Sequence, residues 1–124
     1  LEGARANLEH SLVDEDDFDE PWQGCGGQDV YQFLVDHRPE EDHLVFGHGD
    51  YCLPNVLVEG NEASGFVDLG GAGICDVYND LAIASRSIVY NLGQGFDELF
   101  FELYGVPVVN RELVGYYRAM DELF

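Results

Sequence analysis

One stretch decides the fold: residues 44–80, which read LVFGHGDYCLPNVLVEGNEASGFVDLGGAGICDVYND. Within it, an apolar run leads into His-Gly-Asp at 48–50, and a second apolar run at 65–67 leads into Asp68. Short apolar runs that end at polar residues are typical of β-strands. The stretch therefore predicts two strand ends that carry acidic side chains, with Asn55 on the loop between them.

These residue types, in this order, suit phosphoryl transfer. In the arrangement that protein kinases use, an Asp accepts the hydroxyl proton, and an Asn and a later Asp hold magnesium. Asp50 is the candidate base, and Asn55 and Asp68 offer the hard oxygen ligands that Mg²⁺ prefers. An acidic chain places Asp at many turns, so the spacing by itself leaves open two ordinary turn aspartates.

The sequence around these residues resembles that of the aminoglycoside 3'-phosphotransferases, which are antibiotic-resistance kinases. The resemblance runs from Val13 to Phe124 and is carried by HGDYCLPNVLVEGNEASGFVDLGGAGICDVYNDLAIASRSI and by the closing YYRAMDELF. It implies an α+β fold class: the C-terminal, mainly helical lobe of a protein-kinase-like fold, with a short β segment that carries the catalytic loop. It also implies one domain over residues 1–124, ATP as co-substrate, Mg²⁺ as cofactor, and an aminoglycoside such as kanamycin or neomycin as substrate.

The resemblance further implies a set of substrate-binding residues. Clustered carboxylates can make charge-assisted hydrogen bonds to the ammonium groups of a polycationic sugar. The residues carried over are Asp16 and Asp19 in an acidic loop, Arg86 on a long helix, and Asp121, Glu122 and the carboxylate of Phe124 at the end of the chain. Composition alone leaves open a generic acidic surface for the loop pair and a frayed terminus for the others.

Three more polar residues are predicted to support the site. We expect His48 to organise the catalytic loop by hydrogen bonding, Asp76 to cap a helix, and Asp80 to bond the loop backbone, as its kinase counterpart does. The sequence departs from the family at Gly71, where members usually carry an arginine after the metal-binding Asp. The loss of a cation near the transferring phosphate is expected to weaken electrostatic stabilisation of the transition state.

The charge of the chain is far outside ordinary composition. Among 124 residues there are 25 acidic and 5 basic side chains, a net charge of −20, and no lysine. With 46% hydrophobic and 13% aromatic residues, the chain can build one modest core and is not a disordered acidic tail. Such surfaces stay soluble at high salt, so we predict a halophilic source. The charge disfavours binding to nucleic acid.

The missing lysine bears on the nucleotide. Kinases of this type hold the phosphates with a strand lysine and a Gly-rich loop. The chain has no lysine. It also has no Gly-rich phosphate loop, because the glycines at 24–27 and 70–73 are predicted to serve turns that need positive φ. We therefore expect the N-terminal kinase lobe to be absent, as a missing partner, and the isolated chain to show little kinase activity. Two alternatives stay open: a kinase for another small hydroxyl metabolite, and a non-catalytic lobe that binds polycations.

Cysteine usage and hydropathy indicate the compartment. Cys25, Cys52 and Cys75 are odd in number and widely spaced, which favours free, mostly buried thiols over a zinc site or a disulfide framework. No apolar run approaches the roughly 20 residues that a membrane span requires. We expect a soluble, cytoplasmic protein with no membrane partner.

Local signals predict the other elements. Asp76 and Asn110 are good N-caps, and Gly93 and Gly105 are good helix ends. The predicted helices are 4–12, 28–36, 77–93, 96–104 and 111–124, and the predicted strands are 44–47, 56–59 and 63–67, with a hairpin turn at 59–62.

Overall fold

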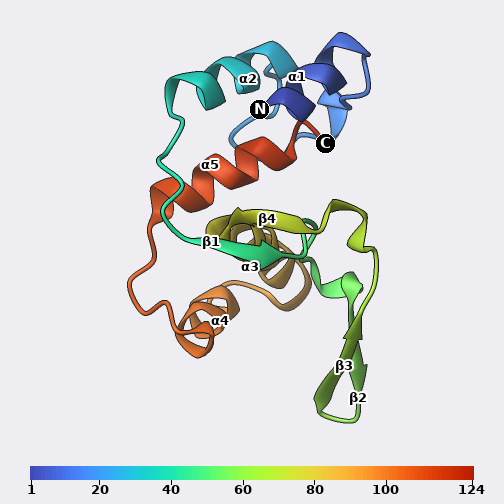
Figure 1. The fold of residues 1–124 in the computed structure, drawn as a ribbon, viewed down its shortest axis with the longest axis vertical. Coiled ribbons are helices and arrows are strands. Elements are labelled where there is room, and N and C mark those ends of the chain that lie inside the picture. The colour runs from blue at the N-terminus through green and yellow to red at the C-terminus, as the bar shows by residue number, and fades with distance from the viewer. The chain divides into compact units, whose positions relative to one another are not determined.

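The computed structural model describes residues 1–124 and divides the chain into two compact units (Figure 1). Unit 1 consists of Leu1–Glu40 and Gly115–Phe124, and unit 2 consists of Glu41–Val114. The prediction of a single domain stays a prediction. None of the helices has the length and apolar character that crossing a membrane would demand.

Unit 1 is helical. Its elements are α1 (Glu2–Glu9), the 3₁₀ helix η1 (Glu15–Asp17), α2 (Gly27–Asp36) and the C-terminal part of α5 (Arg111–Asp121). Val30 and Leu34 are fully buried because residues four apart share one face of a helix. The helix predicted at 28–36 is confirmed as α2. The helix predicted at 4–12 is α1, which ends earlier, before the positive φ of Ser11.

Unit 2 contains two small antiparallel sheets. Its strands are β1 (Leu44–Gly47), β2 (Val56–Glu59), β3 (Glu62–Phe66) and β4 (Gly73–Asp76). The pair β2–β3 is the predicted hairpin, whereas β1 pairs with β4. The strand β4 was not predicted, because its four residues, Gly-Ile-Cys-Asp, show no clear alternation and its partner lies far away in the chain.

The helices predicted at 77–93 and 96–104 are confirmed to within one residue, whereas the helix predicted at 111–124 is α5, which ends at Asp121. In α3 (Val77–Leu92), the Asp76 carboxylate accepts the backbone N–H of Tyr78 at 2.9 Å, and the helix ends at Gly93. The helix α4 (Phe96–Tyr104) ends at Gly105, and the Asn110 side chain caps the first turn of α5. In Figure 1, α3 packs against the β1–β4 pair, and this contact places the helix beside the loop that follows β1.

The core of unit 2 follows the predicted face of α3. Leu81, Ile83 and Ile88 are buried, whereas Val89 is partly exposed. The prediction of positive φ for the glycines at 70–73 is wrong, since none of them adopts it. The left-handed residue of that segment is Asp68, with φ 58° and ψ 54°. In the other glycine cluster, Gly24 does adopt positive φ.

Candidate active site

Asp50 and Asn55 are joined directly. The Asn55 side-chain amide donates to Asp50 Oδ2 at 3.0 Å and to the Asp50 carbonyl oxygen at 2.9 Å. Asn55 is only 8% exposed, so its polar groups need partners within the protein. Because the amide nitrogen is used on Asp50, the side-chain oxygen of Asn55 is the atom that can serve a cation.

Asp68 is tied to the same loop through the residue before it. The Val67 N–H donates to the Asn55 carbonyl oxygen at 3.0 Å, and the Val67 carbonyl oxygen lies 2.8 Å from His48 Nε2. Asp68 itself adopts a left-handed backbone that costs a non-glycine residue on the order of 1–2 kcal/mol. Strain of this kind concentrates where the surrounding structure holds a functional side chain in one direction.

His48 contacts the loop and the segment before Asp68 through its two ring nitrogens. The Asp50 N–H donates to His48 Nδ1 at 3.2 Å, so Nδ1 carries no proton in this arrangement. The proton is therefore on Nε2, which donates to the Val67 carbonyl oxygen. The ring connects the loop to the segment that leads into Asp68, and this geometry supports the structural interpretation of His48.

Asp80 holds the beginning of the loop. Its Oδ2 accepts the backbone N–H of His48 at 2.6 Å, and its Oδ1 accepts that of Gly49 at 2.9 Å. Hydrogen bonds to an ionised acceptor are stronger than neutral ones. Asp80 also lies in the first turn of α3, where the helix dipole favours a negative charge.

The loop backbone touches the segment after Asp68. Gly49 has φ +89°, and a Cβ there would collide with the carbonyl group of Gly71. A Cβ at Gly71, by contrast, would fit, because it would lie 3.7 Å from the Gly49 Cα, which is an ordinary van der Waals contact. Only glycine fits at position 49, whereas a side chain can begin at position 71 without a clash at its Cβ.

Tyr51 is a residue that the sequence analysis missed. Its ring lies 6.1 Å from the His48 ring, 6.0 Å from Phe66 and 6.5 Å from Phe100 on α4, measured between centroids. Burial first, and then the neighbouring Tyr104 and Asp80, raise the pKa of Tyr51. A pattern of aromatic residues scattered over distant segments gives no local signal, so only the fold reveals this cluster.

The cysteines are free but half-buried, so the prediction of mostly buried thiols needs correction. Cys52 follows Asp50 by two positions, and burial, followed by the Asp50 carboxylate, raises the pKa of its thiol. Burial and then Asp80 raise the pKa of the Cys75 thiol in the same way. Both thiols therefore remain protonated at neutral pH, which makes them poor nucleophiles.

The predicted substrate residues divide between the two units. Within unit 1, the backbone N–H of Asp19 donates to both carboxylate oxygens of Glu122 at 3.3 Å, although the two residues are 103 positions apart. The acidic loop and the chain end are thereby brought together. Asp121 is half-buried and Phe124 is exposed in the same unit, whereas Arg86 belongs to α3 in unit 2.

An open hollow in unit 1 adjoins the acidic loop. It has a volume of about 470 Å³ and is lined by Glu15, Asp16, Phe18, Gln23, Gly24, Cys25 and Gly26. Asp16 is exposed there, while Glu15 also accepts the backbone N–H of Gly27 at 2.6 Å. Glu15 and Gln23 were not predicted as site residues, because one more acidic or polar residue carries no signal in so acidic a stretch.

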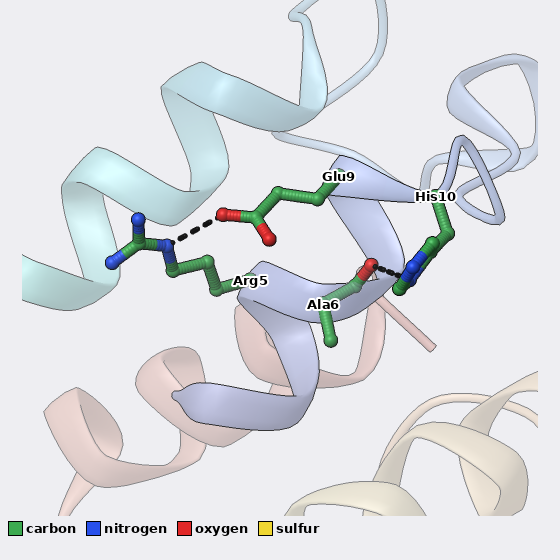
Figure 2. A network of polar contacts seen from close by, with 4 residues as sticks. All are labelled: Arg5, Ala6, Glu9 and His10. Atoms are coloured by element: carbon green, nitrogen blue, oxygen red, sulfur yellow. Dashed lines mark hydrogen bonds and ion pairs between the residues drawn. The ribbon is translucent and has the colours of Figure 1, made fainter.

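One of the five arginines, Arg5, takes part in polar contacts on the surface of α1. Arg5 Nε donates to Glu9 Oε1 at 2.8 Å, and His10 Nδ1 lies 2.9 Å from the Ala6 carbonyl oxygen (Figure 2). Arg5 and Glu9 are exposed neighbours one helical turn apart, and such pairs contribute little to stability. The network is an ordinary solvated helix surface and offers no site.

Asn55 and Asp68 together offer two protein oxygen ligands for magnesium. The chain has no group of three or more His, Cys, Asp or Glu residues that could hold a metal ion. Magnesium in phosphoryl-transfer sites takes only one or two protein ligands, and phosphates and water complete the shell. The side-chain oxygen of Asn55 and the carboxylate of Asp68 suit that kind of site.

The chain belongs to the phosphotransferase enzyme family, whose model matches residues 1–123. It is 40% identical over 125 residues to an aminoglycoside 3'-phosphotransferase of Niallia circulans, covering 100% of this chain and 47% of that protein. It is 35% identical over 127 residues to one of Streptomyces fradiae, covering 98% of this chain and 47% of that protein. The chain therefore spans about half the length of the curated relatives it matches.

Solved structures show the same relationship. An aminoglycoside 3'-phosphotransferase of type VIII superposes with a TM-score of 0.88 at 33% identity, covering 99% of this chain and 48% of that one. An aminoglycoside phosphotransferase of Streptomyces rimosus in complex with ADP and streptomycin superposes with a TM-score of 0.85 at 25% identity, covering 98% and 50%. The resemblance read from the sequence and the predicted α+β fold class are confirmed.

Proposed function

We propose that this chain supplies the catalytic and substrate-binding part of an ATP-dependent aminoglycoside phosphotransferase that confers antibiotic resistance. The observation that carries the proposal is the closed set of hydrogen bonds linking Asp50, Asn55, His48 and Val67, the residue before Asp68. It joins the candidate base to one candidate metal ligand, Asn55, and to the residue that directly precedes the other, Asp68. In this proposal the half of the relatives' length that lies outside the chain provides the nucleotide lobe.

Asp50 would orient the attacking hydroxyl and take its proton. The Asn55 amide binds one oxygen of the Asp50 carboxylate, and this bond fixes the plane of the group. The carboxylate is partly exposed, so a substrate hydroxyl can approach within hydrogen-bond reach. Holding the base in one orientation before the substrate arrives is what positional catalysis requires.

Asn55 and Asp68 would hold Mg²⁺. The ion, when bound, supplies positive charge against the oxygens of the transferring phosphate. Two hydrogen bonds of Val67 keep the two segments together: its N–H donates to the Asn55 backbone carbonyl oxygen, and its carbonyl oxygen accepts from His48 Nε2. ATP is the co-substrate in this proposal, a choice supported by the ADP bound to the Streptomyces rimosus enzyme.

The acidic residues of unit 1 would bind the ammonium groups of the drug. The proposed carboxylates are those of Asp16, Asp19, Asp121, Glu122 and the chain end at Phe124. Arg86, a cation of unit 2, is proposed as a further substrate-binding residue and would not itself bind an ammonium group. Support comes from the Asp19–Glu122 contact, from the hollow beside Asp16, and from relatives that are aminoglycoside phosphotransferases. Ion pairs formed in place of bound water would give the site its preference for polycations.

A second function is favoured by the hollow in unit 1: the binding of polycations without phosphate transfer. Its lining comes entirely from this chain. Calorimetry with kanamycin, in the presence and absence of Mg-ATP, separates the two functions when the chain is joined to a nucleotide-binding half. We expect the nucleotide to change the heat and the affinity. A protein that binds without catalysis would give the same titration with and without Mg-ATP. A panel of simple sugars and amino alcohols, assayed as phosphate acceptors, tests the alternative of another small-molecule substrate.

We further propose a cytoplasmic protein from a halophilic source. The net charge of −20 and the absence of lysine support the high-salt origin. The free cysteines support a reducing compartment.

A further inference from the structure

The backbone N–H groups of the catalytic loop are satisfied mostly by side chains rather than by strand pairing. Those of His48 and Gly49 donate to Asp80, and that of Asp50 donates to His48 Nδ1. Asp80 lies on α3, so the beginning of the loop is attached to that helix. The far end of the loop, which carries Asn55, needs an attachment of its own.

That attachment is Ser87. The loop closes with the 3₁₀ helix η2 (Leu53–Asn55), and the first N–H groups of a helix have no partner inside it. The N-cap residue, Cys52, supplies no side-chain acceptor. Instead, the Leu53 N–H donates to Ser87 Oγ at 2.9 Å, across 34 positions of sequence.

Asn91 holds the hydroxyl of Ser87 in place. Its side-chain amide donates to the Ser87 carbonyl oxygen at 2.8 Å and to Ser87 Oγ at 3.3 Å. A serine hydroxyl can rotate and can accept two hydrogen bonds, so a second donor restricts which direction its lone pairs face. The Asn91 contact thus presents Oγ to the loop as an acceptor.

Asp80 and Ser87 together hold both ends of the loop from one face of α3. Seven positions along a helix make two turns, about 10 Å, and bring the two side chains back to the same face. Asp50 lies between the two attachment points in the chain. We propose that Ser87, oriented by Asn91, is a positioning residue that sets Asn55, and through it the Asp50 carboxylate, for phosphoryl transfer.

The proposal rests on the proposed function for its catalytic consequence, but the attachment can be measured without any activity. In Ser87→Ala, the Leu53 N–H loses its acceptor, and its hydrogen exchange is expected to accelerate on the order of tenfold or more. Ser87→Thr keeps the hydroxyl and should restore slow exchange. Asn91→Ala should give an intermediate rate and covers the case in which Ser87→Ala does not fold. Ser64→Ala, an exposed serine on β3, is the matched control and should leave Leu53 unchanged.

Turnover provides the second readout, in the chain joined to a nucleotide-binding half. Ser87→Ala should lower kcat about tenfold and raise the Mg²⁺ requirement, with little change in KM for kanamycin, and Ser87→Thr should recover kcat. Unchanged Leu53 exchange in Ser87→Ala would overturn the attachment. Faster exchange with unchanged kcat would overturn the positioning role. Faster Leu53 exchange in Ser87→Ala, together with a wild-type protein that transfers no phosphate, would reject the proposed function and leave the attachment standing.

Discussion

The catalytic loop of unit 2 and the acidic region of unit 1 are built on different principles. The loop is held by hydrogen bonds of 2.6–2.9 Å to Asp80 and Ser87, and by a backbone contact that only glycine permits. The acidic region consists of exposed or half-exposed carboxylates around an open hollow, joined by the longer Asp19–Glu122 contacts. The difference teaches that the first region is specified by geometry and the second by charge.

The largest expected effect breaks the geometry of the loop. In Gly49→Ala, the new Cβ meets the Gly71 carbonyl group and the backbone keeps an unfavourable positive φ, so we expect a loss of unfolding free energy above about 3 kcal/mol. Chemical denaturation measures it. Gly60→Ala is the matched control, because Gly60 also has positive φ (+62°) but open space around it. Equal losses in the two variants would show that the contact with Gly71 is not restrictive.

Removal of Asp80 should come next. Asp80→Ala leaves the N–H groups of His48 and Gly49 without their acceptor, and each such loss costs on the order of 1–3 kcal/mol. We expect a drop of about 2–4 kcal/mol in the unfolding free energy, together with faster hydrogen exchange at both amides. Asp42→Ala, on the exposed connection before β1, should do neither. Unchanged exchange at both amides in Asp80→Ala would mean that Asp80 does not hold the loop.

Substitutions in the acidic region of unit 1 should lower the affinity for the drug rather than the stability of the protein. Glu122→Ala removes the carboxylate that contacts the Asp19 N–H and, in our proposal, an ammonium group of the drug. We expect kanamycin affinity to fall about tenfold, since charge-assisted hydrogen bonds contribute roughly 1.5–3 kcal/mol. Calorimetry measures it, with the exposed Glu102→Ala on α4 as the control. Equal affinity in the two variants would remove Glu122 from the substrate site.

Gly71→Arg sharpens the comparison by adding charge to the geometric region. A Cβ at position 71 makes only ordinary contacts with Gly49, at 3.7 Å or more, and a cation there would stabilise the charge of the transferring phosphate. We expect a several-fold gain in kcat in the chain joined to a nucleotide-binding half, with the melting temperature unchanged. An unchanged kcat would show that the missing arginine does not limit the rate of phosphate transfer.

The smallest effect is the response of the whole chain to salt. With a net charge of −20, self-repulsion should weaken as the screening length falls from about 10 Å at 0.1 M to about 3 Å at 1 M. We expect the melting temperature to rise by a few degrees between dilute and molar KCl. An unchanged melting temperature would argue against a halophilic source.

The same contrast explains what could be predicted from the sequence. The caps Asp76 and Asn110 and the end at Gly105 act on their own helices, so local patterns located α3, α4 and α5 closely. The loop attachments join residues about 30 positions apart, such as Leu53 and Ser87, and no periodicity reveals them. The strand β4 was missed for the same reason, because its pairing with β1 is what defines it.

In the acidic region, the problem is the opposite one. Asp16 was chosen by resemblance, but the neighbouring Glu15 lines the same hollow and looks no different in so acidic a chain. Composition hides the functional carboxylates among the others. Only the fold shows which of them surround a common space.

The most direct test of the central claim is phosphate transfer from ATP to kanamycin, followed by ³¹P NMR, with this chain joined to the nucleotide-binding half of a relative. The account predicts a kanamycin phosphate ester with the native Asp50 and none above background with Asp50→Ala. Asp42→Ala should retain full turnover, and both variants should keep the native melting temperature. Transfer by the Asp50→Ala protein at the native rate would contradict the assignment of the base.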